Sequence, residues 1–527
     1  MVSEEVLDLA DIQGAIIPGF RKDHSALIAV RMTDPAAGKA WLRERAGEVS
    51  RADEVLAHNR LFKTMRARRG SERQTPKAVW VSISFSARGL SLLRNEAEIK
   101  KAFDNPFFNG MFQRDLDDAP PSGWVLGGAA ETVPDILLVV AADVSRDLAA
   151  EVRRLLATIK QTKGRGRRGL QVIGTPQLGA TLPDGLKGHE HFGFKDGVSQ
   201  PGVRGLASND PLDFIEDRRL SPQDPLYDLY AEPGQVLVWP GQFVIGYQRQ
   251  NGTELIKPLD PITPRAAWQR NGSYLVYRRL SQKAHLFWRF CTEQANRLTK
   301  EIGRPYSPEA FASLLVGRWP SGAPIVRTPT LDDPKLAADG NSANDFLFSQ
   351  QTPSVTLADG TTAGSAFPVA HPDANGRLCP FSAHIRKVNP RDDPTDTSGL
   401  RETKTRLMLR RGIPYGPAKE PARGLEDDGV DRGLLFMSYQ ASIDRQFEFV
   451  TKTWANLDNS PHDSTPATGH DPIVGQNPGG RFVRIPIDED PLHDVHIPLP
   501  AEPWIVMTGG AYFFTPAISA LSGALVE

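Results

Sequence analysis

Residues that could do chemistry gather in GHEHFGFKDGVSQPGV, residues 188–203, which contains four glycines. Asp196 lies there between a lysine and a glycine. A carboxylate in such a stretch can be a plain turn residue, or it can be an acid–base group directed into a pocket. Gly193 and Gly197 permit tight turns and close backbone approach. The stretch alone leaves both interpretations open.

A second candidate is His384, in CPFSAHIRKVNPR, where a proline near each end bounds a short predicted helix. Its apolar face would carry Phe381, His384, Ile385 and Val388. Two interpretations stay open at this point. His384 is either a core histidine bonded to a carbonyl or an axial haem ligand, with Arg386 and Arg391 binding the propionates.

Two further segments are compatible with a site but do not require one. Arg410 and Arg411, in TKTRLMLRRGIPYGP, could be a surface pair or could carry a charge into a pocket. Leu434 and Phe436 are two residues apart in GLLFMSYQA, so they share one face of a strand. That face could line an apolar cavity or simply pack in a core.

The composition narrows the class of protein. The 527 residues exceed one ordinary core and indicate two domains or one large double domain. Lysine plus arginine is 62 and aspartate plus glutamate is 63, a net charge of −1, so no overall field selects nucleic acid or an anionic membrane. The basic runs at 65–74 and 163–169 are short and separate, and they are interpreted as solvated surface.

Cysteine usage and the first residues predict a location. Only Cys291 and Cys379 are present, which excludes a disulfide framework and favours reduced thiols. The N-terminus has no signal-peptide pattern and no twin-arginine pair, and no apolar run reaches the ~18 residues that span a bilayer. We therefore expect a soluble, cytoplasmic protein without a membrane partner.

The elements that must position these residues follow from periodicity. Strands are predicted at 24–32, 78–86, 135–143, 235–247, 272–280, 433–441, 481–487 and 504–514. Helices are predicted at 37–50, 145–161, 282–303 and 307–319. Strands and helices without a strict βαβ alternation indicate an α+β fold with antiparallel sheets and peripheral helices.

The element order occurs once on each side of a polar stretch, which predicts two similar halves. We divide the chain into residues 1–205 with the glycine-rich motif, a linker at 206–234, and residues 235–527 with His384. Residues 325–380 and 455–479 read as long connections, and long ordered loops are often functional.

In their order along the chain, these motifs resemble dye-decolourising peroxidases, a haem enzyme family. Residues 193–197 match the family's GxxDG motif, CPFSAHIRKVNPR its proximal-histidine motif and LRRGIPYG its distal-arginine motif. Flanking segments such as DIQGAIIPGF, PGQFVIGY and TGGAYFF occur in the family's order. The resemblance covers most of the chain and is strongest to the long branch with fungal and bacterial members.

The resemblance implies two ferredoxin-like halves, with haem b held mainly by the C-terminal half. His384 would be the iron ligand, Asp196 a proton relay and Arg410 a fixed positive charge over peroxide. Arg410 is preferred to Arg411 by resemblance alone. Leu434 and Phe436 would keep the pocket apolar and narrow.

Two residues are assigned by position only. Glu448 is expected to accept the second N–H of His384, and Trp454 is either a packing residue or an electron relay to the surface. The implied reaction reduces H₂O₂ and oxidises dyes, phenolics or other aromatic donors through a ferryl intermediate. The alternative is a haem carrier or iron-release protein, which would keep His384 but need neither Asp196 nor Arg410. The oligomeric state stays open.

Overall fold

The structure is a computed structural model of the 527-residue chain. It describes residues 3–70, 76–164, 168–206, 214–303, 305–395, 399–419 and 423–527. Parts of the predicted linker and of both basic runs lie outside these described residues.

The N-terminal half forms an antiparallel sheet around β1 (His24–Met32), which pairs with β3 (Ile136–Ala142). β2 (Val79–Phe85) pairs with the other edge of β3, and β4 (Leu170–Val172) and β5 (Gln177–Ala180) pair with β1. All seven residues of β3 are buried, so this strand carries helices or other chain on both faces. The helices of this half are α1 (Pro35–Arg45), α2 (Ala52–Arg69), α3 (Ala87–Leu93), α4 (Glu96–Ala102), α5 (Asn105–Asn109) and α6 (Ser145–Gln161).

The C-terminal half repeats this arrangement around β8 (Ser273–Gln282). β11 (Gly433–Gln440) and β14 (Ile505–Thr515) pair with its two edges, and β9 (Leu409–Arg410) and β10 (Ile413–Tyr415) pair with β11. In the N-terminal half β1 lies between β3 and β4, and in the C-terminal half β8 lies between β11 and β14. This is the ferredoxin-like strand order. Helices α7 (Ala284–Ile302) and α8 (Pro308–Val316) follow β8, and two short π-helical segments, Ile443–Glu448 and Val450–Ala455, follow β11.

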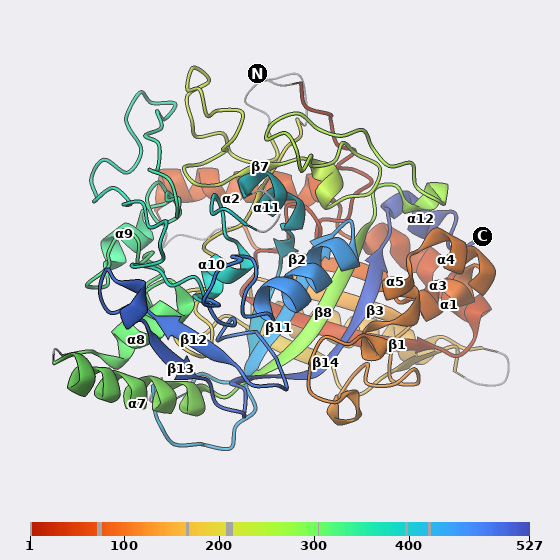
Figure 1. Ribbon diagram of the computed structural model, residues 1–527. Helices are drawn as coiled ribbons and strands as arrows, with labels where there is room; N and C mark the ends of the chain where they lie inside the picture. Colours follow the sequence, from red (N-terminus) through yellow and green to blue (C-terminus); the bar gives the residue numbers. More distant parts are fainter. Residues whose placement is uncertain are drawn as a thin grey trace.

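The two halves form one continuous sheet. β14 joins β2 through a single residue pair, Phe514 and Phe85. β10 is one end of the strand path, and it lies against β5, which pairs with β1 near the other end. A Cβ added to Gly179 of β5 would come within 2.5 Å of Ile413 Cγ2 of β10. The sheet therefore curls until its two ends meet. Figure 1 shows it crossing the molecule, with α7 and α8 at one end and α1, α3, α4 and α5 at the other.

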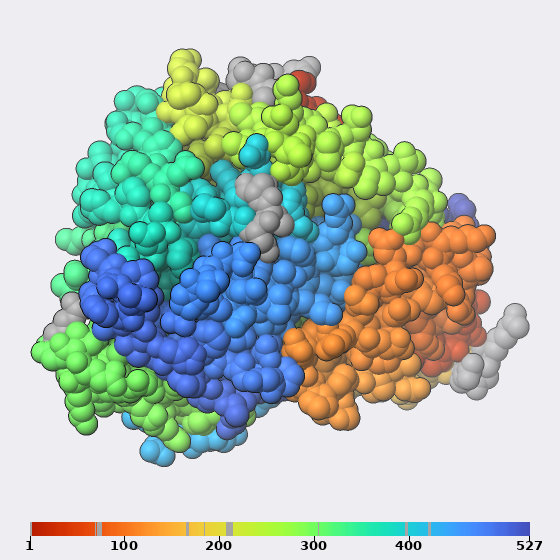
Figure 2. Space-filling view, in the orientation of Figure 1, coloured from red at the N-terminus to blue at the C-terminus, as the bar shows by residue number. Residues whose placement is uncertain are grey.

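Long connections cover the C-terminal half and carry short elements. These are β6 (Gly202–Val203), β7 (Leu237–Val238), β12 (Phe482–Ile485), β13 (Val495–Pro498), α9 (Pro334–Ala338), α10 (His384–Val388) and α11 (Leu400–Arg406). The last helix, α12 (Ile518–Ser522), follows β14 and packs against α1 of the N-terminal half. On the face in Figure 2, late residues in blue lie between early residues in orange and the middle of the chain in green and teal. Segments that are distant in sequence thus share one surface.

The predicted α+β fold is confirmed, and two local predictions are wrong. The strand expected at 235–247 is only β7, because Pro240 and Gly241 end it and start a 3₁₀ turn. The predicted helix around His384 is reduced to the five residues of α10. Helix α2 was not predicted, because its apolar residues follow no regular helical stripe.

The stretch between the halves is packed in its described part. Leu220, Tyr227 and Tyr230 are buried in a cluster with Val355 and Leu357 of the long 325–380 connection. The division at 1–205, 206–234 and 235–527 stays a prediction. Among the described residues, no helix is both long and apolar enough to cross a bilayer.

Candidate active site

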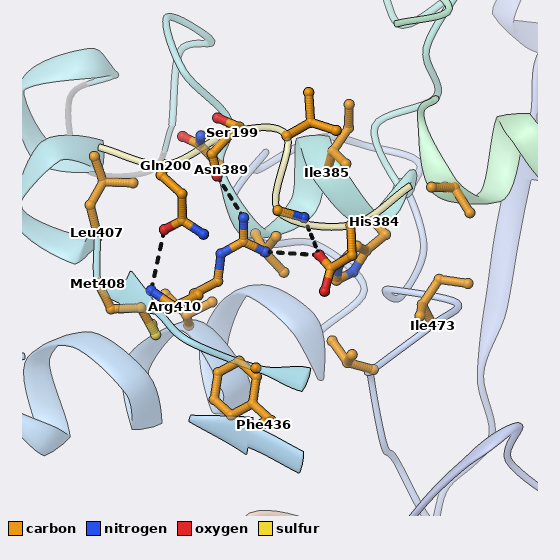
Figure 3. A pocket seen from close by; sticks show the side chains of 18 of the residues that line it. Ser199, Gln200, His384, Ile385, Asn389, Leu407, Met408, Arg410, Phe436 and Ile473 are labelled. Carbon is orange, nitrogen blue, oxygen red and sulfur yellow. Dashed lines mark hydrogen bonds and ion pairs between the residues drawn. The ribbon is translucent and has the colours of Figure 1, made fainter. Parts of the chain in front are cut away.

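A cavity of about 330 Å³ lies where the glycine-rich motif meets the C-terminal half. Residues 194–201 line one part of it, α10 and α11 line others, and the side chains of β8 and β11 form a wall. His384, Asp196 and Arg410, which are distant in sequence, all line this cavity. Figure 3 shows Arg410 extended toward the segment of Ser199 and Gln200, with His384 across the cavity.

His384 is the first residue of α10, and a buried carboxylate orients its ring. Nδ1 donates a hydrogen bond of 2.8 Å to Asp471 Oδ2, and Asp471 is fully buried. The other oxygen, Oδ1, accepts from the backbone N–H groups of Ile473 and Val474. Since Nδ1 carries the donated proton, Nε2 is left as the lone-pair nitrogen that could bind a metal.

The pair is also electrostatically coupled. Burial opposes the charge on His384, but Asp471 more than compensates, and the pKa of His384 is raised above its ordinary value. Burial likewise opposes ionisation of Asp471, yet the charge and hydrogen bond of His384, with the two backbone donors, lower the pKa of this carboxyl. Asp471 therefore stays an anion that increases the donor strength of the imidazole.

The prediction for Glu448 is wrong, because Asp471 takes the place assigned to it. Glu448 accepts two hydrogen bonds from Arg114, at 2.7 and 2.6 Å, and one from Tyr512 at 2.8 Å. It joins the two halves instead of contacting His384. The missed residue, Asp471, lies in the 455–479 loop, and its only sequence signal was that this loop is long.

The prediction for Arg386 is also wrong. Its guanidinium is fully buried and bonds Asp393 through Nε and Nη2 and Asp373 through Nη1. It is stacked against Phe381 and Phe348, and it does not line the cavity. Arg386 follows His384 by two positions, about 200° around a helix, so it points to the opposite side.

Arg391 does line the cavity, as does Arg318, which was not singled out in the sequence. Arg391 has a positive φ of 53°, and its guanidinium donates to the Phe346 carbonyl at 2.6 Å and stacks on that ring. Arg318 bonds the carbonyls of Gly322 and Ala343. Burial lowers the pKa of Arg391 to about 10 and that of Arg318 to about 9. Both remain cationic and would bind carboxylates.

Asp196 and Arg410 meet on the side of the cavity away from Asp471. Arg410 Nη1 lies 3.8 Å from Asp196 Oδ1, and Nη2 donates to the Ser199 carbonyl at 2.6 Å. Both side chains are partly exposed, at 42% for Asp196 and 35% for Arg410. Arg411 is directed elsewhere and donates to the Ile16 carbonyl, outside the cavity. Geometry thus separates two arginines that spacing could not.

The two motif glycines have different surroundings. Both adopt a positive φ, 89° at Gly193 and 72° at Gly197, which favours glycine. A Cβ at either position would meet nothing within 4 Å, so backbone conformation alone favours glycine. Gly197 lines the cavity, whereas Gly193 does not, and the predicted cofactor contact of Gly193 is wrong.

The structure places the predicted residues of β11 in the cavity wall and the predicted relay tryptophan in the protein interior. Leu434 and Phe436 of β11 both line the cavity. Trp454 is fully buried in the second π-helical segment, with its ring against Phe449. It has no exposed surface on which a large donor could dock directly.

The donor set fits a haem. The described residues contain no group of three His, Cys, Asp or Glu side chains that could hold a bare metal ion. A metal at His384 Nε2 would need to bring its other ligands, as a porphyrin iron does. The cavity supplies apolar walls for a flat ring, and Arg318 and Arg391 are suited to propionates.

Comparison with known proteins identifies the family. A model of the DyP dimeric alpha+beta barrel domain matches residues 11–165, and one of the Dyp-type peroxidase C-terminal domain matches residues 355–468. The chain is 30% identical to dye-decolorizing peroxidase msp1 of Mycetinis scorodonius, over 98% of this chain and 88% of that protein. The α+β fold and the residues of this site are thus those of a class of peroxidases. The chain belongs to the dye-decolorizing peroxidase family.

Solved structures agree with this assignment. The structure of an ancestral D-type dye-decolorizing peroxidase is 30% identical, with a TM-score of 0.75 over 99% of both chains. A DyP-type peroxidase of Auricularia auricula-judae is 28% identical, with a TM-score of 0.73 over the full length of both. By contrast, a deferrochelatase of Yersinia pestis matches only 14% of this chain, at 38% identity.

Proposed function

We propose that this protein is a haem b peroxidase that reduces H₂O₂ and oxidises dyes or other aromatic donors. The observation that carries the proposal is the joint placement of His384, Asp196 and Arg410 around one cavity. A haem carrier or iron-release protein would need the histidine but not the opposing pair. The family match supports the enzyme and does not favour that alternative.

His384 would hold the haem iron through Nε2, while Asp471 fixes the ring and keeps it electron-rich. Arg318 and Arg391 would bind the propionates. Leu434 and Phe436, which line the wall formed by β11, would exclude bulky molecules from the part of the cavity that takes peroxide. The C-terminal half would therefore supply most of the contacts. Haem, when bound, supplies the redox chemistry that cleaves the peroxide O–O bond.

On the open side of the cavity, Asp196 would take a proton from one peroxide oxygen and return it to the other. Its carboxylate can do so only when ionised and within hydrogen-bond reach. Arg410 keeps its positive charge and would stabilise negative charge on the peroxide oxygen. Their 3.8 Å separation leaves each group able to bond a small molecule between them.

Large donors would deliver electrons from the protein surface, because the cavity is narrow. Trp454 remains a proposed relay only as an internal step, since it is buried. A donor would bind elsewhere and pass its electron inward.

The test is peroxide reactivity of purified, haem-loaded protein and of Arg410→Leu. We expect the variant to keep its haem and to react with H₂O₂ roughly 10²–10³-fold more slowly in stopped-flow measurements, the typical loss for one preorganised donor. Arg411→Leu is the matched control, since Arg411 is next in sequence but outside the cavity. Equal rates for wild type and Arg410→Leu would reject the proposed role.

A further inference from the structure

Two methionines line the cavity, and the proposed function gives neither of them a role. They are Met408, which directly precedes β9, and Met507 of β14. Methionine thioethers are oxidised to sulfoxides, which turns a flexible apolar side chain into a polar one. A cavity that receives peroxide therefore brings an oxidant close to these two sulfur atoms.

The Met408 side chain is directed into the same part of the cavity as that of Arg410. The chain is extended on both sides of Met408, because Leu407 has φ −64° and ψ 145° and Leu409 belongs to β9. Leu409 is 2% exposed and packs in the core, whereas Met408 and Arg410 both line the cavity. Side chains two positions apart in an extended chain share one face. Figure 3 shows the Met408 and Arg410 side chains next to each other, near Phe436.

The two cavity methionines differ in access. Met408 is partly buried, as are Leu434 and Phe436, which pack against the same core cluster. Met507 is 3% exposed, and its sulfur accepts a hydrogen bond of 3.1 Å from Arg278 Nε. A buried sulfur that shares its electrons with a guanidinium N–H is a poorer target for an oxidant. Met408 is therefore the more open of the two.

The other described methionines lie outside the cavity. Met32, Met111 and Met437 are buried in the two main core clusters. Met65 of α2 is partly exposed on the surface, so it meets the peroxide of the bulk solution. It serves as an internal reference for oxidation that does not depend on the cavity.

We propose that Met408 is a site of oxidative modification: peroxide held beside Arg410 transfers one oxygen atom to Met408 Sδ when no reducing donor consumes it. This deepens the proposed function and rests on it. A sulfur lone pair bonds one peroxide oxygen as the O–O bond breaks, and the other oxygen leaves as water with both protons. Sulfur is oxidised by two electrons and peroxide is reduced by two, so the products are methionine sulfoxide and water.

The sulfoxide changes the cavity where peroxide would bind. Its oxygen is a polar acceptor, whereas a thioether sulfur accepts only weakly. Arg410 donates to the Ser199 carbonyl from Nη2, and Nη1 lies 3.8 Å from Asp196, so the guanidinium has N–H groups left for another acceptor. A sulfoxide oxygen bonded there takes donors that the proposed function assigns to peroxide. Oxidation of Met408 therefore slows the reaction with further peroxide.

The first experiment maps added oxygen by peptide mass spectrometry. The haem-loaded protein is treated with a few equivalents of H₂O₂ without a reducing donor, and catalase stops the reaction. We expect one added oxygen at Met408 several-fold sooner than at Met65 or Met507. Modification of either of these at the same rate as Met408, or faster, would overturn the proposal. This measurement needs no substitution, so it holds even if a variant loses haem.

A pair of arginine variants tests whether the Arg410 guanidinium directs the oxidation. In Arg410→Leu, the preference for Met408 over Met65 should disappear. In Arg411→Leu the preference should persist, since Arg411 does not line the cavity. An undiminished preference for Met408 in Arg410→Leu would contradict the proposal.

Two substitutions of Met408 test the effect on peroxide reactivity. Met408→Leu keeps an apolar side chain of similar volume that cannot take up oxygen. Pretreatment with peroxide should lower the stopped-flow rate several-fold in wild type and less in Met408→Leu, each relative to its own untreated protein. Equal relative losses would overturn the proposal, because the damage would then lie at another residue.

Met408→Gln places an amide oxygen near the position of the sulfoxide oxygen. Untreated Met408→Gln should react with peroxide as slowly as pretreated wild type, and a rate equal to that of untreated wild type would contradict competition for Arg410. Failure of the proposed function is distinguishable from failure of this inference. In that case wild type and Arg410→Leu would react with peroxide at the same rate, whatever the pattern of added oxygen.

Discussion

On the His384 side of the cavity, charged side chains are buried and held by several partners, whereas on the Arg410 side they are partly exposed and held by few. Asp471 has no exposed surface and accepts from a ring and two backbone N–H groups. Asp196 accepts from the backbone N–H of Gly197 and lies 3.8 Å from Arg410. The side chains near Arg410 therefore have hydrogen-bonding capacity left for a small molecule, whereas Asp471 has little.

The difference matches two tasks. A cofactor ligand must be fixed, and surrounding hydrogen bonds fix its tautomer and direction. Groups that handle a small substrate must have bonding capacity left for it. If this comparison is right, changes on the His384 side should affect cofactor binding and stability, and changes on the Arg410 side should affect the peroxide rate with the cofactor retained.

The largest expected effect is that of His384→Ala. Among the described residues that line the cavity, His384 is the only histidine, so its loss should abolish or severely weaken haem retention. The haem-to-protein ratio and the Soret absorbance after gel filtration measure it. An unchanged ferric spectrum at full occupancy would show that iron is bound elsewhere.

Arg386→Gln should mainly reduce stability. Removing one partner of a buried ion pair costs about 3–5 kcal/mol, and Asp373 and Asp393 would both lose theirs. Burial opposes ionisation of Asp393, but the charge and hydrogen bonds of Arg386, together with those of His462, outweigh it and lower the pKa of Asp393 to about 2. Wild type therefore keeps this stabilisation above about pH 4 and loses it as the pH falls toward 2.

Denaturant unfolding of Arg386→Gln at neutral and acid pH tests this, with Arg377→Gln as a partly exposed ion-pair control. The free energy of unfolding of the variant should depend less on pH below 4 than that of wild type. Normal stability with lost haem would mean that Arg386 contacts the cofactor after all.

Asp471→Asn should have an intermediate effect. The amide can still bond Nδ1, so haem should remain, but the anion that increases imidazole donor strength is lost. Outer-shell changes of this kind typically cost 10–100-fold in metal affinity or activity. Haem dissociation rates and the Fe(III)/Fe(II) potential measure it, and Glu448→Gln should leave both near wild type. The reverse outcome would restore Glu448 as the partner of His384.

The smallest effect is expected for Asp196→Asn, because water and Arg410 can share the proton transfer. The change keeps the side-chain shape and removes the base. We expect a slower reaction with H₂O₂, measured by stopped flow at several pH values. Rates that equal wild type at every pH would make Asp196 a turn residue only.

The sequence predicted what periodicity and local motifs encode. Strands β1, β3 and β11 were located within one residue at each end, because alternating or continuous apolar residues bounded by turn formers mark them. The motif positions of His384, Asp196 and Arg410 also identified cavity residues. In each case, the residue and its structural context lie in one short segment.

The sequence could not predict pairings between distant segments. Asp471 is 87 positions from His384, and nothing in its local sequence differs from a loop carboxylate. Glu448 looked equivalent, but the π-helical segment turns it toward Arg114. Arg386 was misplaced for a different reason, since helical geometry already put it on the face away from His384.

The single residue pair that joins the two halves of the sheet, Phe514 and Phe85, has a consequence for synthesis of the chain. The strands of the N-terminal sheet are complete by residue 180, and β2 then pairs with β3 on one edge only. Its other edge gains a neighbour through Phe514 of β14, near the end of the chain. While the ribosome makes the intervening residues, the backbone of β2 is an open edge that could pair with another nascent chain. β14, the last strand to be synthesised, is therefore the strand that meets the open edge of β2.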